Sequence, residues 1–316
     1  MADEAQPPPE TKLLPDAPTD GVSQMLYLPA SASSSSRLAS TSWDGTVCLY
    51  DTSERKRVLS HAMESGPLLS LAAPSGMNAV VTGGLDGSIR MLDFETSNIQ
   101  TVGRHGMESS DGKVACSCLA ALSSPPNTTT TTQTQTGTPL IASAGWDSQF
   151  HVWDLRQQTP VATIKLPGKA FSMDYDAVNN RVVVATSGRR TCFFDVNNPT
   201  SMESMVLERE SSLKYQTRCV RFFPDGAAIA LGSVEGRVAV EFLDELNVPA
   251  TGGRKKYAFK CHRSGDLVYP VNCIEFHPHY GTFATGGCDG SVGTYRTYCI
   301  EYCTHVMLEA HPLLLL

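Results

Sequence analysis

One short pattern recurs along this chain and limits what the chain can fold into. Each copy consists of a short apolar run of β-forming residues, a Gly or Ser, any residue, Asp-Gly or a variant of it, and a second, alternating apolar run. The six copies are marked by Asp44, Asp86, Asp147, Gly188, Glu235 and Asp289. Their spacings are 42, 61, 41, 47 and 54 residues. A period in the low forties is typical of a β-propeller, in which each copy forms one blade.

The Asp-Gly step of the pattern predicts a tight turn between two strands. Two-residue hairpins need positive φ, which Gly adopts freely and Asp tolerates. An inner strand precedes each turn, for example at 68–72, 170–175 and 271–276. Because blades pack face to face, we expect strands that are apolar on both sides. The predicted fold class is therefore all-β: a WD-repeat β-propeller with six recognisable blades of an expected seven, the last blade missing or aberrant.

Several acidic residues of the repeats are interpreted as structural. Aromatic-Asp pairs close three copies, at Tyr50-Asp51, Trp153-Asp154 and Phe194-Asp195. A carboxylate at such a turn accepts hydrogen bonds from the turn backbone. In WD repeats it also bonds a preceding histidine, and the candidates for this role are His61, His105 and His262.

Composition shifts mark the ends of the propeller and one insert. Residues 1–20 contain five prolines, five acidic residues and one lysine, and we expect a disordered, acidic, Pro-rich tail there. The propeller is predicted for residues 21–296. Within it, a low-complexity insert at 123–138 accounts for the spacing of 61 residues. After Val292 the aromatic-Asp closure is absent, so 297–316 is predicted to be a C-terminal tail outside the ring.

Charge and composition exclude several classes of function. The chain has 25 basic and 32 acidic residues, and its net charge of −7 disfavours unspecific nucleic-acid binding. No window approaches the roughly 18 apolar residues of a membrane-spanning helix. The ten cysteines include no Cys-x-x-Cys pair, and we expect them to be reduced. The sequence therefore predicts no membrane association and no direct nucleic-acid partner.

Catalytic and metal-binding motifs are also missing from the sequence. There is no P-loop, no Gly-x-Ser-x-Gly, no His-Glu-x-x-His and no dinucleotide-binding fingerprint. Cys299, Cys303 and His305 have loose metal-ligand spacing but lack a fourth ligand. We therefore predict a protein that is not an enzyme and has neither a cofactor nor a metal site.

Two tryptophans and a local excess of cations point to a binding surface. Trp43 and Trp146 occupy the same turn position, and an exposed indole is typical of interface hot spots. The alternative is that each packs on a neighbouring loop. Residues 206–265 carry ten cations against seven anions, and Arg218 and Arg237 would form a fork for a carboxylate or phosphate if both reach one face. Otherwise they are solvated surface charges.

The same basic region carries a family resemblance. Residues 209–219, 232–241, 255–263 and 269–272 resemble the spindle-checkpoint WD-repeat proteins of the budding-uninhibited-by-benzimidazole (Bub) group. The resemblance covers about residues 20 to 292, and the related Rae-type RNA-export factors share it. The run from Lys214 to Arg218 is more similar to the checkpoint members, because the export members tend to have His in place of Tyr215.

This resemblance implies a non-enzymatic adaptor of the mitotic spindle-assembly checkpoint, in the nucleus and at kinetochores in mitosis. Such proteins bind acidic GLEBS segments of a Bub-type checkpoint kinase and of a Mad/Bub-related pseudokinase. They also bind phosphorylated Met-Glu-Leu-Thr repeats of a kinetochore scaffold. Carried over by position, the residues that contact a GLEBS segment are Trp43, Trp146, Arg218 and Arg237. Those that contact the phosphopeptide are Arg237, Lys260 and Arg263.

Other functions remain open from the sequence alone. A Rae-type mRNA-export adaptor that binds a nucleoporin is the first alternative. A substrate receptor for a cullin ubiquitin ligase is another, because Trp153-Asp154-x-Arg156 fits a short motif of such receptors.

Overall fold

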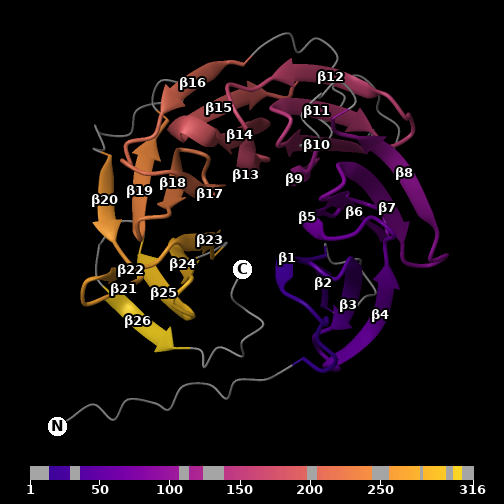
Figure 1. The fold of residues 1–316 in the computed structure, drawn as a ribbon, viewed down its shortest axis with the longest axis horizontal. Helices are drawn as coiled ribbons and strands as arrows, with labels where there is room; N and C mark the ends of the chain where they lie inside the picture. Colours follow the sequence, from indigo (N-terminus) through magenta and orange to yellow (C-terminus); the bar gives the residue numbers. More distant parts are fainter. Residues whose placement is uncertain are drawn as a thin grey trace, which may run out of the picture.

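The strands predicted from the repeats are present as six sheets. The computed structural model describes residues 14–28, 36–106, 114–123, 139–197, 205–243, 256–277 and 280–296, and the backbone of a strand at 302–307. Each sheet has four antiparallel strands that follow one another in the chain, and we number these sheets as blades I to VI. Figure 1 shows the blades arranged around a central axis, with the first strand of each blade innermost.

Blades I to III come from the first half of the chain. Blade I contains β1 (Val22–Tyr27), β2 (Arg37–Ser42), β3 (Thr46–Asp51) and β4 (Lys56–Ala62). Blade II contains β5 (Leu68–Ala72), β6 (Ala79–Gly84), β7 (Ser88–Asp93) and β8 (Ile99–Arg104). Blade III contains β9 (Cys116–Leu122), β10 (Leu140–Gly145), β11 (Gln149–Asp154) and β12 (Pro160–Lys165).

Blades IV to VI complete the described ring. Blade IV contains β13 (Ala170–Asp176), β14 (Arg181–Thr186), the short 3₁₀ turn η1 (Ser187–Arg189), β15 (Arg190–Asp195) and β16 (Leu207–Glu210). Blade V contains β17 (Thr217–Phe222), β18 (Ala228–Ser233), β19 (Arg237–Phe242) and β20 (Tyr257–Lys260). The small hairpin of β21 (Arg263–Ser264) and β22 (Leu267–Val268) leads to blade VI, which contains β23 (Val271–Phe276), β24 (Thr282–Gly287), β25 (Ser291–Arg296) and β26 (Tyr302–Met307).

The blades pack in chain order and form an all-β propeller, as predicted. The innermost strands β1, β5, β9, β13, β17 and β23 pack each against the next. Within the described residues, no comparable packing joins β23 to β1, so the ring of six blades is open between blades VI and I.

The core lies between the blades rather than within one of them. Each of five apolar clusters draws on two consecutive blades; in the cluster between III and IV, Phe150 stacks on Phe194 with ring centroids 4.2 Å apart. Every residue of β6, β10, β14 and β18 is buried, because neighbouring blades cover both faces of each strand. Burying one Leu or Phe contributes about 1.5–3 kcal/mol, so these interfaces supply most of the favourable free energy of folding.

Each innermost strand carries a β-bulge at its second residue. The register with the second strand of the blade slips there, which leaves one residue without a partner in the pairing. The bulged residues are Ser23, Leu69, Ser117, Phe171, Arg218 and Asn272. Bulges redirect side chains and are common next to functional sites.

Side chains of one innermost strand bond the backbone of the next. The amide of Leu71 donates to Gln24 Oε1 (2.9 Å), and the amide of Val220 donates to Ser172 Oγ (3.1 Å). The amide of Phe222 donates to a carboxylate oxygen of Asp174 (2.6 Å). These bonds fix neighbouring blades to one another around the central axis.

The ends of the propeller differ from the predicted boundaries. The amide and hydroxyl of Thr19 both donate to Asp44 Oδ2 (2.8 Å), and the Tyr50 hydroxyl donates to the carbonyl of Asp16 (3.1 Å). Residues 14–20, which we expected in a disordered tail, therefore lie against blade I because its turn carboxylate and tyrosine offer them partners. Strand β26, from within the expected C-terminal tail, pairs with β25. Residues 1–13, most of the insert (124–138) and the end of the chain lie outside the described residues.

Two expectations from composition can be compared with the described part of the chain. It contains no helix long and apolar enough to cross a membrane. Its eight cysteines are free thiols, of which six are buried.

Candidate functional site

Six equivalent turns define one face of the propeller. In each blade, the first residue of the turn between the second and third strands donates its amide to the carbonyl just before the innermost strand. The six donors are Trp43, Leu85, Trp146, Ser187, Val234 and Cys288, with N···O distances of 2.8–3.1 Å. We call the face that carries these turns the upper face. Trp43 and Trp146 thus occupy the same structural position in blades I and III, and both side chains are partly exposed.

The turn aspartates hold the backbone of this face in place. Each accepts the amide of the residue two positions later, at 2.9–3.1 Å. The four carboxylates are those of Asp44, Asp86, Asp147 and Asp289. At Asp44, burial opposes ionisation, but the hydrogen bonds from Thr46 and Thr19 lower the pKa to about 2. These contacts support the structural interpretation of the turn aspartates.

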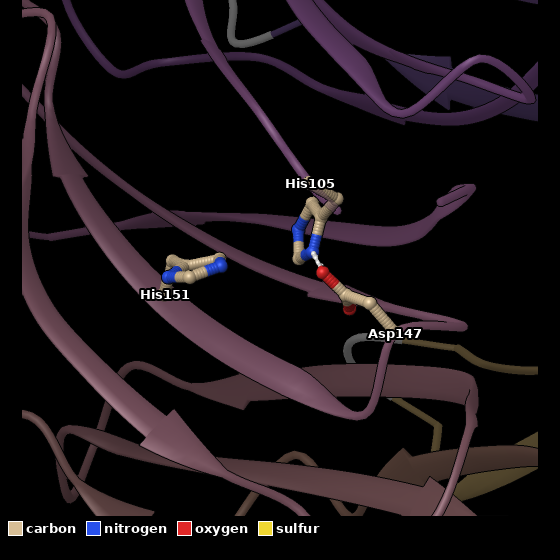
Figure 2. Close-up of side chains that lie close together, drawn as sticks. All are labelled: His105, Asp147 and His151. Carbon is tan, nitrogen blue, oxygen red and sulfur yellow. Dashed lines mark hydrogen bonds and ion pairs between the residues drawn. The ribbon is translucent and has the colours of Figure 1, made fainter. Parts of the chain in front are cut away.

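A hydrogen-bond chain connects the turn of blade III to its strands, and Figure 2 shows its first link, between His105 and Asp147. His105 lies 3.0 Å from Asp147 through Nδ1, and its Nε2 lies 2.8 Å from Ser143 Oγ. The indole of Trp153 donates to the same Ser143 oxygen at 2.8 Å. The Asp147 carboxylate can only accept, so Nδ1 of His105 donates to it; in the neutral imidazole Nε2 then accepts, and the Ser143 hydroxyl donates to Nε2 while its oxygen accepts from the indole. The network therefore assigns one tautomer to His105.

The same arrangement recurs in blade VI but not in blade I. His262 bonds Asp289 through Nδ1 (2.9 Å) and Thr285 through Nε2 (2.8 Å). His61 makes no such bond among the described residues, so our expectation for it is wrong. The residue that matches His105 in blade I is the buried Met63, which donates its amide to Gly45 as His105 does to Gly87. His61 lies two residues earlier, within β4.

His105, Asp147 and His151 could each offer one ligand atom to a metal ion, and these atoms lie within 4.8 Å of one another. Both ring nitrogens of His105 are already used in hydrogen bonds, however, and Nδ1 of His151 lies 2.9 Å from Thr163 Oγ1. Burial, together with the neighbouring His105, lowers the pKa of His151 to about 4. The donor set therefore fits a structural network better than a metal centre. The side chains of Cys299, Cys303 and His305 lie outside the described residues.

A cluster of cations surrounds one carboxylate at the upper end of blade V. Arg237 Nε lies 2.6 Å from Glu235 Oε1. Arg263 donates from Nη2 to the Glu235 carbonyl (2.8 Å) and lies 3.8 Å from its carboxylate. Lys260 stands directly opposite Arg237 in the register of β19 and β20, and its side chain is exposed. We call Arg237, Lys260 and Arg263 the blade V cation cluster.

Arg218 lies on the same face, closer to the central axis, because β17 is the innermost strand of blade V. It is exposed at the bulge of β17. The starts of β17 and β19 share the upper edge of blade V, but β18 lies between them, which separates their backbones by about 10 Å. Arg218 and Arg237 therefore both lie at the upper edge of blade V, with their backbones two strands apart.

Two exposed aromatic residues of the upper face were not proposed as binding residues from the sequence. Phe171, which is 38% exposed, is the bulge residue of β13, equivalent to Arg218 in blade V. Tyr215, which is 56% exposed, precedes β17. Phe171 could have been identified from the sequence as the second residue of a predicted inner strand, the position at which each innermost strand bulges.

The side chains of Trp153, Asp154 and Arg156, which fit the motif of ubiquitin-ligase receptors, make hydrogen bonds within the propeller. Trp153 is 2% exposed and its N–H bonds Ser143. The Arg156 guanidinium bonds Asp154 at 2.7 Å.

The repeated turn contacts, the histidine networks and the blade topology define the class of the protein: it is a WD-repeat β-propeller. Residues 16–51 and 253–293 match the family described as WD domain, G-beta repeat. The chain is 40% identical to mitotic checkpoint protein bub3 of Dictyostelium discoideum over 280 residues, which cover 87% of this chain and 75% of the relative. It is 37% identical to mitotic checkpoint protein BUB3.1 of Arabidopsis thaliana over 288 residues, which cover 88% and 75%. It is 32% identical to the poly(A)+ RNA export protein of Schizosaccharomyces pombe over 302 residues, which cover 93% and 75%.

The chain therefore belongs to the Bub3 family of WD-repeat proteins, within the superfamily that includes the poly(A)+ RNA export protein. This finding confirms the resemblance stated from the sequence.

Proposed function

We propose that this protein is a non-enzymatic adaptor of the mitotic spindle checkpoint that captures acidic peptides on its upper face. Its ligands are GLEBS-type segments of a Bub-type kinase and of a related pseudokinase, and phosphorylated Met-Glu-Leu-Thr repeats of a kinetochore scaffold. The protein acts in the nucleus and at kinetochores. The names of its relatives in three eukaryotes support the checkpoint role.

The blade V cation cluster is the observation that carries this proposal. Arg237 and Arg263 both pair with the carboxylate of Glu235, and Lys260 lies opposite Arg237 on the neighbouring strand, so the cluster carries an excess of positive charge. Among the described residues, the terminal nitrogens of Arg237 have no acceptor, and its side chain is 35% exposed. A guanidinium in this state is suited to a carboxylate or a phosphate. A phosphothreonine would bring about −1.5 to −2 charges to the cluster.

The aromatic residues of the upper face suit the apolar positions of the same peptides. Trp43 and Trp146 are held at rigid turns, and Phe171 is held at a bulge. Rigid aromatic anchors lose little conformational entropy on binding and are frequent hot spots. Arg218, whose backbone is separated from that of Arg237 by about 10 Å, would meet a second acidic residue of a GLEBS segment.

Binding of a labelled phosphothreonine Met-Glu-Leu-Thr peptide, measured by fluorescence polarisation, tests this function. Removing a hydrogen bond to a charged group costs about 1.5–3 kcal/mol, so Arg237→Ala should weaken binding by about ten- to a hundredfold. Lys56→Ala is the control, because Lys56 is exposed at the start of β4, on the opposite face. Equal affinity of the wild type and Arg237→Ala for the phosphopeptide, or equal affinity of the wild type for the unphosphorylated peptide, would contradict the proposal.

An RNA-export adaptor is the second candidate, favoured by the similarity to the poly(A)+ RNA export protein. Both functions use an acidic segment on the same face, so peptide affinity does not separate them. Affinity purification of the full chain from mitotic extract does: checkpoint kinases indicate the first function, and a nucleoporin indicates the second.

A further inference from the structure

The loop between blades IV and V presents part of the upper face. Residues 211–216, which we call the connecting loop, join β16 to β17. Lys214 and Tyr215 are exposed, and Arg218 follows two residues after the loop. Leu213 is 3% exposed and packs in the apolar cluster between blades IV and V. The loop thus has a buried anchor directly before its exposed residues.

The turn of blade IV differs from the aspartate turns of blades I, II, III and VI. Gly188 and Arg189 take the place of Asp-Gly, and both have positive φ, at 73° and 62°. An Arg in this conformation costs about 1 kcal/mol relative to Gly. A residue other than Gly keeps such a strained backbone conformation only where contacts with the surrounding structure hold it there.

Arg189 makes three contacts with the chain around the connecting loop. Its Nη1 donates to the carbonyl of Leu213 at 2.9 Å. Its Nη2 forms an ion pair with Glu210. Its own carbonyl accepts the amide of Ser211 at 2.8 Å. One residue of blade IV therefore holds both the start of the loop and the carbonyl that precedes Lys214.

Two further contacts hold the loop from either side. The amide of Ser212 donates to Glu241 Oε1 of blade V at 2.8 Å. The side-chain amide of Gln216 donates to the carbonyl of Thr186 at 3.1 Å. Neither contact reaches the Leu213 carbonyl, for which Arg189 is the donor among the described residues.

We infer that Arg189 is a positioning residue of the peptide-binding face: it orders the connecting loop so that Tyr215 and Arg218 are presented to an acidic peptide in a fixed arrangement. Its guanidinium is engaged by Glu210 and by the Leu213 carbonyl, so it acts through the loop rather than on the ligand. A loop ordered before binding saves the entropy that a mobile loop loses on capture. The part of this inference that concerns binding rests on the proposed function.

The test compares three variants of the full chain. Arg189→Gly removes the side chain and suits the positive φ, so the turn itself is not strained. Arg189→Lys keeps the charge but lacks the fork that reaches two acceptors at once. Arg190→Ala is the matched control, because Arg190 is the next residue and, within the described part of the chain, its guanidinium pairs with the partly exposed Glu208, at 3.6 Å. Thermal unfolding establishes that each variant is folded.

Two measurements then separate this inference from the proposed function. Amide hydrogen exchange of the free protein should be about tenfold faster across residues 211–218 in Arg189→Gly, with a smaller change in Arg189→Lys and none in Arg190→Ala. The affinity for an acidic GLEBS-type probe peptide should fall about tenfold in Arg189→Gly, chiefly through faster dissociation.

Equal exchange of the loop in Arg189→Gly and Arg190→Ala would overturn the positioning role. Faster exchange with unchanged affinity would overturn its part in binding. If the wild type does not bind the probe, the proposed function fails, and the exchange data alone decide whether Arg189 orders the loop.

Discussion

Removing the Ser143 hydroxyl should cost more than removing the equivalent hydroxyl of blade VI. Ser143 Oγ serves two buried groups, the Trp153 indole N–H and His105 Nε2, both at 2.8 Å. Thr285 Oγ1 in blade VI serves one, His262 Nε2, also at 2.8 Å. The substitutions Ser143→Ala and Thr285→Val each remove one hydroxyl and keep most of the side-chain shape.

The difference between the two substitutions follows from the number of groups left unpaired. Ser143, His105 and Thr285 are at most 1% exposed and Trp153 is 2% exposed, so water does not replace the lost partner. A buried polar group without a partner costs about 1–3 kcal/mol. We therefore expect Ser143→Ala to lower the free energy of unfolding by about 4 kcal/mol, and Thr285→Val by about 2 kcal/mol.

Urea unfolding followed by far-ultraviolet circular dichroism measures both values, provided that the m-value is unchanged. A third variant isolates the indole contribution. In a Trp153→Phe background, Ser143→Ala leaves only His105 unpaired, so its additional cost should fall to about 2 kcal/mol. The reasoning is refuted if Ser143→Ala costs no more than Thr285→Val, or if its cost is the same with Phe at position 153.

Two other predictions concern Asp174, on the innermost strand of blade IV, and the turns. Burial raises the pKa of Asp174 from 3.8 to about 6, against the opposing charge of Arg221. Between these two pH values the folded protein therefore binds more protons than the unfolded chain. The free energy of unfolding should then fall by up to about 3 kcal/mol as the pH rises from 4 to 6. The substitution Asp174→Asn should reduce this dependence of the free energy of unfolding on pH. The second comparison is between Gly188→Ala and Gly236→Ala. Both residues have positive φ, but a Cβ at Gly236 would lie 2.7 Å from the Cys261 carbonyl, whereas nothing lies within 4 Å of one at Gly188. Thermal or urea unfolding should show a loss of about 1 kcal/mol for Gly188→Ala and at least twice that for Gly236→Ala; equal losses would contradict the packing argument.

The repeated local signals predicted the fold because each acts over a few residues. The turns, the alternating strands and the marker spacing are all present as blades with the expected order. The predicted two-residue hairpin is wrong, however: three residues separate the strands at each Asp-Gly step, and of the Asp-Gly pair only the Gly has positive φ, at Gly45, Gly87 and Gly290. Trp43 and Trp146 were assigned the same position from the turn pattern alone, and their backbone contacts are equivalent. These features depend on the φ preferences and side-chain alternation of neighbouring residues.

Errors arose where a contact depends on strand length or on another blade. His61 was expected to match His105, but the residue that reaches that position in blade I is Met63, because β4 extends to Ala62. Residues 14–20 were expected to be disordered, but Asp44 and Tyr50 of blade I bind them. Their acidic and Pro-rich composition carried no information about these partners.

The sequence by itself determined the blade, its turns and its repetition, since each blade is a run of adjacent strands joined by short connections. The tertiary structure decided which side chains of different blades meet. Arg189 reaches Leu213 across the boundary between two blades, and Arg218 lies two strands away from Arg237. Such contacts depend on how one sheet packs on the next and on where each strand bulges, and these arrangements follow from close packing of the whole ring rather than from any local pattern.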